Sequence, residues 1–508
     1  MASDRPNILF LMSDQHNAHC LGSYGHEAVQ TPNLDALAAR GVRLTSAFAQ
    51  NPICTPARVC ALSGLYAHNT GRYGLYGPNL NWLPSMFSHF RQQGYHTGAI
   101  GKLHTPVGWI EAHADSVRDT VLPPGGNHYA AYLAENAIAA DDGRLRLTGW
   151  TGRGQGIDAE PAKIPKELSK EGFCAAKGRE FLSARPKDKP FFLWYTTCKP
   201  HQMYTPAPEF WNLYDEDLPL PPNAEDDCVG RPRHVRSRLE RLRAPDCPHW
   251  VIEPRNYDAA RKRVLRGYYG NVTQMDWAMG QLLQGLREEG LEENTLVVYV
   301  SDHGDFAGEH GMIEKAPGIG FDCITRVPMI WRWPGRLPDN GVRDQLVEQV
   351  DIFPTLCALA GIPPLQMFDG HDLADILIND GGDVREAAFT ENPLTKAVHT
   401  RRWNYVHWQQ PMFPDLEEPI GELYDRQNDP WEKTNLFADP KHLPVVRDMQ
   451  RILLNWMIGS AHPTTLQPSP LVSREEPSRG SPSEPLPEDG RFSPRRVLEH
   501  GRKWNAYM

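Results

Sequence analysis

Residues suited to binding a divalent metal ion follow two apolar runs of the sequence. "NILFLMS" runs into Asp14, and "LVVYVS" runs into the pair Asp302-His303. Carboxylate oxygens with an adjacent imidazole nitrogen suit a divalent cation. Taken singly, Asp14 has the alternative of a turn-forming residue, and Asp302-His303 has the alternative of a helix cap. Together they predict a metal site.

Residues suited to binding an anion follow two further apolar runs. "HTGAI" leads into "GKLH", and "FFLWYTT" leads through "CKP" to a histidine, which gives Lys102, His104 and His201. An ammonium group and imidazoles suit the anion that a neighbouring metal ion helps to hold. Either histidine alone is more often a structural residue. The four runs together predict one polar site for a metal ion and an anion.

The stretch "NPICTPARVCALSG" places a cysteine where a helix begins. Ser, Thr, Asp or Asn usually stand there, because their oxygens accept hydrogen bonds from the free N–H groups. Pro56 is tolerated in a first turn. Cys54 and Arg58 are four residues apart and share one helix face, and the helix N-terminus adds partial positive charge. The pattern predicts an anion site around the Cys54 sulfur, whereas Cys60 faces the core.

A thiolate nucleophile is one chemistry that suits Cys54 and Arg58, as in phosphatases that combine these residue types. Those phosphatases use a glycine-rich loop and no metal ion. This chain instead has acidic, metal-binding residue types after two of its apolar runs. A simple thiol nucleophile therefore fits the sequence poorly.

The four apolar runs are typical of strands buried on both faces, because each is continuous rather than alternating. We place these strands at 8–13, 97–100, 191–196 and 296–301. Helical patterns separate them, which predicts an α/β fold with a large, mostly parallel sheet flanked by helices. In such sheets the ligand site lies outside the carboxyl ends of the strands. The fold therefore brings the polar residues to one edge.

Helix boundaries are marked in two of the intervening segments. "NLDALAARG" has Asn33 as its N-cap and Gly41 after its last turn. "LPSMFSHFRQQG" starts with Pro84 and stops at Gly94. Proline at the start and glycine past the end match the residue preferences of helix termini.

Helices are also predicted in three further segments. The spacing of apolar residues predicts amphipathic helices over 268–289 and 351–361. The stretch 231–243 carries six arginines, which favours a solvated helical face over an anion or partner site. We interpret the glycosylation sequon at Asn271 as incidental, because the chain shows no secretion signal.

The chain of 508 residues is longer than one ordinary core serves, so we expect a large domain with a smaller one appended. The α/β pattern predicts a larger domain over 1–365, which carries the predicted metal and anion site. Short aromatic-rich stretches such as "RRWNYVHW" predict a smaller antiparallel-sheet subdomain over 366–460. The remainder, 461–508, is rich in Pro, Ser, Glu and Arg, and we expect a loosely ordered tail or an arm that joins copies in a homo-oligomer.

The composition argues against several classes of partner. A net charge of −10 disfavours nucleic-acid binding, which depends on clustered Lys and Arg. No stretch approaches the roughly 20 apolar residues of a membrane span. The apolar run after Pro6 is shorter than the hydrophobic region of a signal peptide, and the nine cysteines lack CxxC pairs and are expected to be reduced. We therefore expect a cytoplasmic protein without membrane or nucleic-acid partners.

The stretch around Cys54 resembles the signature of the type I sulfatase family, within the alkaline-phosphatase-like superfamily. That signature is Cys-x-Pro-Ser/Ala-Arg followed by Leu-Thr/Ser-Gly, and this chain reads Cys-Thr-Pro-Ala-Arg over 54–58 and Leu-Ser-Gly over 62–64. Further motifs resemble the family in order along 5–440: "TPNLDALAARGV", "GKLH", "KPHQMYTPAPEF", "SDHGDFAGEHG" and "ELYDRQNDPWEKTNL". The resemblance implies an alkaline-phosphatase-like α/β fold and hydrolysis of organic sulfate monoesters.

The resemblance also implies that Cys54 is the precursor of the working group. In this family a formylglycine-generating maturation enzyme oxidises the cysteine to formylglycine, whose aldehyde hydrates to a geminal diol. One hydroxyl attacks the sulfur of the ester, and the other loses its proton to expel sulfate and regenerate the aldehyde. A serine or a thiol lacks that second step.

The resemblance assigns roles to the other motif residues. A divalent cation would be bound by Asp14, the modified Cys54, Asp302 and His303. Arg58 would stabilise the formylglycine. The sulfate oxygens would be held by Lys102, His104, His201 and Lys315. Either His201 or Lys315 would assist the departure of the alcohol.

Three positions depart from the commonest pattern of the family. Many members have Asp-Asp where this chain has Asp14-Gln15, Asp-Asn where it has Asp302-His303, and Ser where it has Ala57. All three variants resemble the branch that holds choline sulfatases and phosphonate monoester hydrolases. With fewer acidic ligands the cation is either Ca²⁺ or Mn²⁺, because imidazole suits softer ions. Gln15 is either a metal ligand or a neighbour of one.

Three functions stay open at this point. The first is hydrolysis of a small-molecule sulfate ester through the formylglycine hydrate and the metal ion. The second is hydrolysis of phosphonate monoesters or phosphodiesters, because the same groups serve phosphorus esters. The third is a non-catalytic anion-binding protein whose Cys54 stays a thiol, which the joint presence of metal-binding and cationic residues disfavours.

Overall fold

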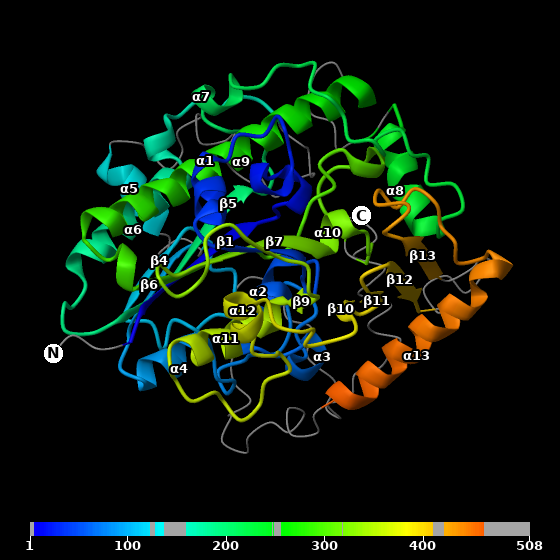
Figure 1. The fold of residues 1–508 in the computed structure, drawn as a ribbon. Coiled ribbons are helices and arrows are strands. Elements are labelled where there is room, and N and C mark those ends of the chain that lie inside the picture. Colours follow the sequence, from blue (N-terminus) through cyan, green and yellow to red (C-terminus); the bar gives the residue numbers. More distant parts are fainter. Residues whose placement is uncertain are drawn as a thin grey trace, which may run out of the picture.

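The structure is a computed structural model that describes residues 5–121, 128–136, 159–245, 247, 256–316, 318–409 and 421–461. Its centre is a large β-sheet with helices on both faces, and a second, smaller sheet lies to one side (Figure 1). This architecture confirms the predicted α/β class with a smaller antiparallel sheet. Within the described ranges, no helix is long and apolar enough to cross a membrane.

In the described part of the chain, the large sheet has nine strands in the order β4-β3-β5-β1-β6-β7-β2-β8, with β9 paired to β2. Their bounds are β1 Asn7–Asp14, β2 Val42–Phe48, β3 His96–Gly101, β4 Ser116–Asp119, β5 Phe191–Pro200, β6 Thr295–Ser301, β7 Arg326–Arg332, β8 Gly341–Arg343 and β9 Val347–Glu348. Strands β3, β5, β1 and β6 are parallel neighbours, whereas β7 runs antiparallel to β6 and β2. The four predicted strands are confirmed as this parallel centre.

Helices cover both faces of the large sheet (Figure 1). On one face lie α1, α6 and α9, and on the other lie α2, α4, α11 and α12. The helix bounds are α1 Pro32–Ala39, α2 Cys54–Ser63, α3 Ala67–Thr70, α4 Met86–Gln92, α5 His128–Glu135, α6 Lys170–Ala184, α7 Pro208–Trp211, α8 Arg233–Arg243, α9 Tyr257–Glu288, α10 Asp322–Thr325, α11 Ile352–Leu359, α12 Ala374–Asn379 and α13 Leu443–Ser460.

Strand β1 shows why its apolar run is unbroken. Leu9 and Leu11 belong to the core cluster that includes residues of α1, α6 and α9. Ile8, Phe10 and Met12 belong to the cluster on the other face, with residues of α2, α4 and α11. Successive side chains of a strand point to opposite faces, so a strand covered on both faces needs apolar residues at every position.

The predicted N-cap at Asn33 is wrong, because α1 begins at Pro32 and Asn33 is its second residue. The free N–H groups of the first turn are satisfied by Asp276 of α9. Its carboxylate accepts from Asn33 N at 3.1 Å and from Leu34 N at 2.8 Å. A carboxylate from a distant helix thus replaces a local cap. The helix ends at Ala39, so Gly41 follows it as predicted.

The predicted start of α4 at Pro84 is wrong by two residues. The helix begins after Ser85, whose Oγ accepts from Ser88 N while Ser88 Oγ accepts from Ser85 N. This reciprocal capping box satisfies two free donors. Gly94 follows the end of the helix with a φ of +88°, a left-handed conformation that suits glycine and agrees with the predicted stop.

The two predicted amphipathic helices are present, but the arginine-rich stretch differs from its interpretation. The helix over 268–289 is the second part of the longer α9, and the one over 351–361 is α11. The stretch 231–243 contains α8, yet Arg231 is only 2% exposed and pairs with Asp226 at 2.7 Å. The solvated-face prediction is therefore wrong in part, since a charge run does not reveal which distant acceptors surround it.

The smaller sheet is antiparallel, in the order β10-β11-β12-β13. Its bounds are β10 Ala388–Glu391, β11 Thr395–His399, β12 Trp403–Trp408 and β13 Gly421–Asp425. Helix α13 covers one face through Phe389, Tyr405 and Leu423. Val406 and Tyr424 on the other face belong to a core cluster shared with the large sheet. The smaller sheet therefore packs against the larger one.

The domain boundaries predicted at 365/366 and 460/461 stay predictions. The predicted tail over 461–508 lies almost entirely outside the described residues, as does much of the segment between β4 and α6.

Candidate active site

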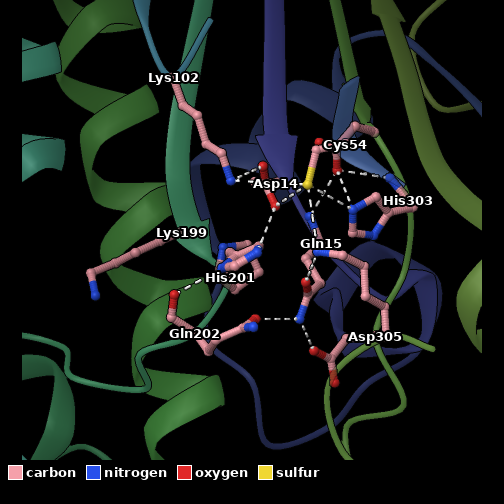
Figure 2. Close-up of polar contacts among 12 residues, drawn as sticks. Asp14, Gln15, Cys54, Lys102, Lys199, His201, Gln202, His303 and Asp305 are labelled. Carbon is pink, nitrogen blue, oxygen red and sulfur yellow. Dashed lines mark hydrogen bonds and ion pairs between the residues drawn. The ribbon is translucent and has the colours of Figure 1, made fainter. Parts of the chain in front are cut away.

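The carboxyl ends of β1, β3, β5 and β6 meet at one edge of the large sheet, and the predicted polar residues lie there (Figure 2). Asp14 is the last residue of β1, and its carbonyl accepts from His201 N at 3.1 Å beyond the end of β5. Asp302 follows β6, and its N–H donates to Ser13 O at 3.1 Å. Lys102 follows β3. The sheet edge thus gathers side chains that are far apart in the sequence.

Helix α2 begins at Cys54 and places the sulfur at the same edge. The side chain at its N-cap position, Ile53, accepts no hydrogen bond, and every residue of the helix is buried. Pro56 lies in the first turn, and Cys60 is fully buried in a core cluster, both as predicted. Cys54 is therefore the first residue of the helix, one position after the N-cap where a capping oxygen usually stands, and it is only 2% exposed.

Four side chains form a group that fits a divalent metal ion: Asp14, Cys54, Asp302 and His303. One ligand atom from each lies within 4.8 Å of the others, and all four residues are buried. Cys54 Sγ lies 3.3 Å from His303 Nε2 and 3.6 Å from Asp14 Oδ1. His303 Nδ1 donates to Gly304 O at 2.9 Å, which orients the ring and leaves Nε2 facing the group. Two carboxylates and an imidazole are ordinary ligands of such a cation.

Arg58 bridges the two carboxylates. Its Nε donates to Asp302 Oδ2 and its Nη2 donates to Asp14 Oδ2, each at 3.0 Å. Its Nη1 donates to Thr196 Oγ1 at 2.9 Å and to the carbonyl of Lys102. The side chains of Arg58, Asp14 and Asp302 are all fully buried. This charge-assisted network therefore fixes the orientation of both carboxylates.

Two lysines approach the sulfur of Cys54. Lys102 Nζ lies 4.0 Å from Sγ and pairs with Asp14 Oδ2 at 2.6 Å, and Lys315 Nζ lies 3.4 Å from Sγ. Burial raises the pKa of the Cys54 thiol, but Lys102, Lys315 and His303 outweigh it and hold this pKa well below its usual value. The site therefore stabilises negative charge at the sulfur, which is the electrostatic requirement for binding an anion.

His201 lies on the other side of Asp14. Burial, followed by the charges of Lys102 and Lys315, lowers the pKa of His201 to about 4, so its imidazole is neutral near neutral pH. Its Nδ1 donates to Gln202 O at 2.8 Å, and its Nε2 lies 3.9 Å from Asp14 Oδ1. The ring therefore presents its unprotonated nitrogen to the site.

His104 approaches Cys54 from the turn after β3. A hydrogen bond between the two side chains contributes to the low pKa of the Cys54 thiol. Among the described residues, the buried His104 Nδ1 has no hydrogen-bond partner. The structure thus brings together all the predicted site residues: Asp14, Cys54, Arg58, Lys102, His104, His201, Asp302, His303 and Lys315.

Gln15, which the sequence leaves as a ligand or a neighbour, contacts Lys315: its Oε1 accepts from Lys315 Nζ at 2.7 Å. Its Nε2 donates to Gln202 Oε1 at 3.1 Å and to Asp305 Oδ2 at 2.5 Å (Figure 2). Sequence reasoning missed Gln202 and Asp305. The local signal for both is adjacency, since one follows His201 directly and the other lies three residues after Asp302.

A buried asparagine of α9 shapes the turn that carries His201. Asn271 Nδ2 donates to the carbonyls of Pro200 at 3.2 Å, His201 at 3.4 Å and Met203 at 3.0 Å. Its Oδ1 accepts from Lys199 Nζ at 2.6 Å, and Lys199 points away from the site in Figure 2. Asn271 is fully buried in the folded chain, which agrees with an incidental sequon.

We expect Asn271→Leu to lower the free energy of unfolding by about 2–4 kcal/mol, because buried carbonyls and the Lys199 ammonium lose their partner. Urea unfolding of the purified proteins measures the difference. Asn212→Leu, at an exposed position, is the control and should change stability by less than about 0.5 kcal/mol. Equal stability of both variants would show that Asn271 does not hold this turn.

The carboxyl edge of a mostly parallel sheet carries buried side chains that could hold a metal ion, beside lysines and histidines. These groups suit the hydrolysis of an anionic ester. The family model described as Sulfatase matches residues 6–362. A second, described as N-sulphoglucosamine sulphohydrolase, C-terminal, matches residues 308–457. The chain belongs to the sulfatase family of the alkaline phosphatase superfamily, and it is a sulfuric ester hydrolase.

Relatives match along most of the chain. An arylsulfatase of Clostridium perfringens (strain 13 / Type A) is 28% identical over 478 residues, which cover 90% of this chain and 95% of the relative. A choline-sulfatase of Rhizobium meliloti (strain 1021) is 28% identical over 461 residues, which cover 87% and 84%. The solved structure of a phosphonate monoester hydrolase from Silicibacter pomeroyi is 22% identical, has a TM-score of 0.77 and covers 91% and 97%. That structure shows the shared fold.

Proposed function

We propose that the protein hydrolyses a small organic sulfate monoester to an alcohol and inorganic sulfate, with Cys54 converted to formylglycine beside one divalent cation. The observation that carries this proposal is the position of Cys54. Its buried sulfur lies at a helix N-terminus, within 4.8 Å of two carboxylates and an imidazole, and within 4.0 Å of two ammonium groups. A formylglycine-generating maturation enzyme is the partner that this chemistry requires.

The cation would be held by Asp14, the modified Cys54, Asp302 and His303. When bound, it lowers the pKa of the attacking hydroxyl and withdraws charge from the ester. The imidazole of His303 favours Mn²⁺, and the two carboxylates also suit Ca²⁺. Arg58 keeps both carboxylates turned toward the cluster, because it donates to one oxygen of each.

The sulfate group is held by lysine and histidine side chains that surround the position of the Cys54 sulfur. Lys102, His104 and Lys315 all approach that atom. Negative charge grows on the sulfate oxygens and the leaving oxygen as the ester bond breaks. N–H donors that are already in place stabilise this charge without reorganisation, which is usually the largest catalytic effect.

Lys315 is better suited than His201 to donate a proton to the leaving alcohol. Its ammonium group has three N–H donors and lies 3.4 Å from Cys54 Sγ. His201 is neutral, with a pKa of about 4, and its Nδ1 proton is donated to Gln202 O. Lys315 therefore assists the alcohol. The contact predicted between His201 and the sulfate oxygens stays a prediction, because it requires a proton on Nε2.

Two measurements test the proposal. Mass spectrometry of tryptic peptide 44–58, which contains Cys54 and no other cysteine, is expected to show formylglycine when the host supplies the maturation enzyme. Side-by-side assays should show faster hydrolysis of an aryl sulfate than of a phenyl phosphonate ester. A large preference for the phosphonate would support the second function instead, because the branch that Gln15 and His303 resemble holds phosphonate monoester hydrolases as well as choline sulfatases. An unmodified thiol in that peptide would rule out the formylglycine mechanism.

Removal of the metal ion is expected to lower kcat for the aryl sulfate by roughly 10³-fold or more. EDTA dialysis followed by elemental analysis establishes the metal-free state, and Mn²⁺ or Ca²⁺ added back should restore the rate. Circular dichroism serves as the control for folding. Full activity in protein shown to be metal-free would contradict a metal-assisted reaction.

A cytoplasmic location, a homo-oligomer joined through 461–508, and the lack of nucleic-acid and membrane partners stay predictions from the sequence. None of them affects the chemistry proposed for the site.

A further inference from the structure

Arg238 of α8 reaches the loop that carries Lys315. Its Nη2 donates to Ile313 O at 2.9 Å and to Lys315 O at 3.1 Å. Its side chain is 12% exposed, and its guanidinium lies over the ring of Phe306, 5.9 Å from the ring centroid. A single nitrogen of the Arg238 side chain therefore binds the backbone carbonyls of the two residues that flank Glu314.

The shape of this loop depends on contacts from outside it. The carbonyl of Glu314 accepts from Phe306 N at 2.9 Å. Three successive backbone carbonyls, those of residues 313–315, therefore accept hydrogen bonds from Arg238 or Phe306. Glu314 has a φ of +62°, a left-handed conformation that is unfavourable for a residue with a side chain. External hydrogen bonds must hold such a conformation in place.

The two ends of Lys315 are held by different partners. Arg238 holds its backbone carbonyl, while Gln15 Oε1 accepts from its Nζ at 2.7 Å. The ammonium lies 3.4 Å from Cys54 Sγ. A lysine side chain is long and flexible, so the position of Nζ depends on where the loop fixes its backbone.

Helix α8 has its own anchor. Val235, Leu239 and Leu242 are buried and belong to the main core cluster. The helix is therefore held by apolar contacts, and Arg238 projects from an element that does not need it for docking. Arg233 on the same helix is exposed, which offers a matched comparison.

We propose that Arg238 is a positioning residue for Lys315, so that α8 contributes to ester hydrolysis without touching the substrate. This inference rests on the proposed function, in which Lys315 donates to the leaving alcohol. Without Arg238 the loop relaxes and the ammonium moves relative to the reacting atoms. A misplacement of about 1 Å in such a group costs on the order of 10²-fold in rate.

The test measures kcat and KM for sulfate esters in Arg238→Met, Arg238→Lys and Arg233→Ala. Arg238→Met keeps an apolar stem and removes the donors, and we expect kcat to fall roughly 30-fold. Arg238→Lys supplies an ammonium for the same carbonyls and should recover most of the rate, whereas Arg233→Ala should match the wild type. The fall in kcat of Arg238→Met should be larger for esters whose leaving alcohol is weakly acidic, because only these alcohols need a proton donor to depart. A merely structural defect would lower all rates equally.

A double-mutant cycle with Lys315→Ala separates positioning from general damage. In the Lys315→Ala background, Arg238→Met should lower kcat by less than about 2-fold, because the group it positions is gone. Equal losses in both backgrounds, or an Arg238→Met enzyme as active as Arg233→Ala, would overturn the proposal. If Arg238→Met does not fold, Arg238→Gln takes its place in the same cycle. Failure of the wild type to hydrolyse any sulfate ester would instead overturn the proposed function.

Discussion

Replacement of Cys54 by alanine is expected to lower kcat for sulfate esters by at least about 10⁴-fold relative to the mature enzyme. The side chain at this position is the source of the proposed nucleophile. Lys102 and Lys315 would remain in place and could still bind an anion. Binding and charge stabilisation without a nucleophile leave only a small residual rate.

Two further variants sharpen this experiment. Cys54→Ser keeps a hydroxyl but has no second one to expel sulfate, so it should complete at most one turnover. Cys60→Ala changes a buried core cysteine of the same helix and should keep kcat within about 3-fold while losing some stability. All proteins are produced with the maturation enzyme and assayed on one aryl sulfate. A Cys54→Ala enzyme within about 100-fold of the wild type would contradict the assigned role.

The Arg58→Met variant is expected to lose about 3–5 kcal/mol of unfolding free energy in metal-free buffer. The guanidinium is completely buried between Asp14 and Asp302. Its removal leaves two buried carboxylates without the cation that bridges them. Burial and the charge of Asp14 already raise the pKa of Asp302, so the loss of Arg58 would push this carboxyl further toward protonation and weaken its affinity for a metal ion.

The measurement is urea unfolding in the presence of EDTA, because a bound metal ion would itself stabilise the native state. Arg58→Lys retains the positive charge but loses the bidentate donor geometry of the guanidinium. Its free energy of unfolding should therefore lie between those of Arg58→Met and the wild type. Arg402→Met removes a surface ion pair with Asp425, at a side chain that is 49% exposed, and should cost less than about 1 kcal/mol. Equal losses of unfolding free energy in Arg58→Met and Arg402→Met would show that the buried ion pairs of Arg58 stabilise the fold no more than a surface ion pair does.

The placement of the site could be predicted because its residues follow strongly patterned strands. Asp14 follows an apolar run over 8–12 and one serine, and Asp302 follows an apolar run over 296–300 and one serine. Such continuous runs identify central parallel strands. Parallel strands bring their carboxyl ends to one edge, so the contacts of these residues follow from topology alone. Cys54 could be joined to these residues because the motif over 54–58 resembles the sulfatase signature. The catalytic roles of these residues stay predictions until the variants are measured.

Other contacts that sequence reasoning missed join segments that carry no local signal. The carboxylate of Asp276 serves the first turn of α1 from a helix far along the chain, which moves the start of α1 away from the predicted cap. Arg238 sits in a run of arginines that reads as solvated, yet it binds two loop carbonyls. Gln15 gives no sign in the sequence that its amide will meet Lys315. Such contacts depend on where side chains lie in three dimensions. Helix, strand and capping preferences describe only residues that are close together in the sequence.

The burial of Cys54 has a consequence for biosynthesis. Its neighbours over 51–53 are also buried in the native chain. A modifying enzyme therefore cannot bind this segment once folding is complete. During synthesis this stretch emerges well before β6 and the Asp302-His303 pair, which later enclose it. The proposed oxidation of Cys54 would therefore take place after the N-terminal part of the chain has left the ribosome and before β6 has emerged. A polypeptide that folds without meeting the maturation enzyme would then keep an unmodified thiol, and only unfolding would expose this thiol again.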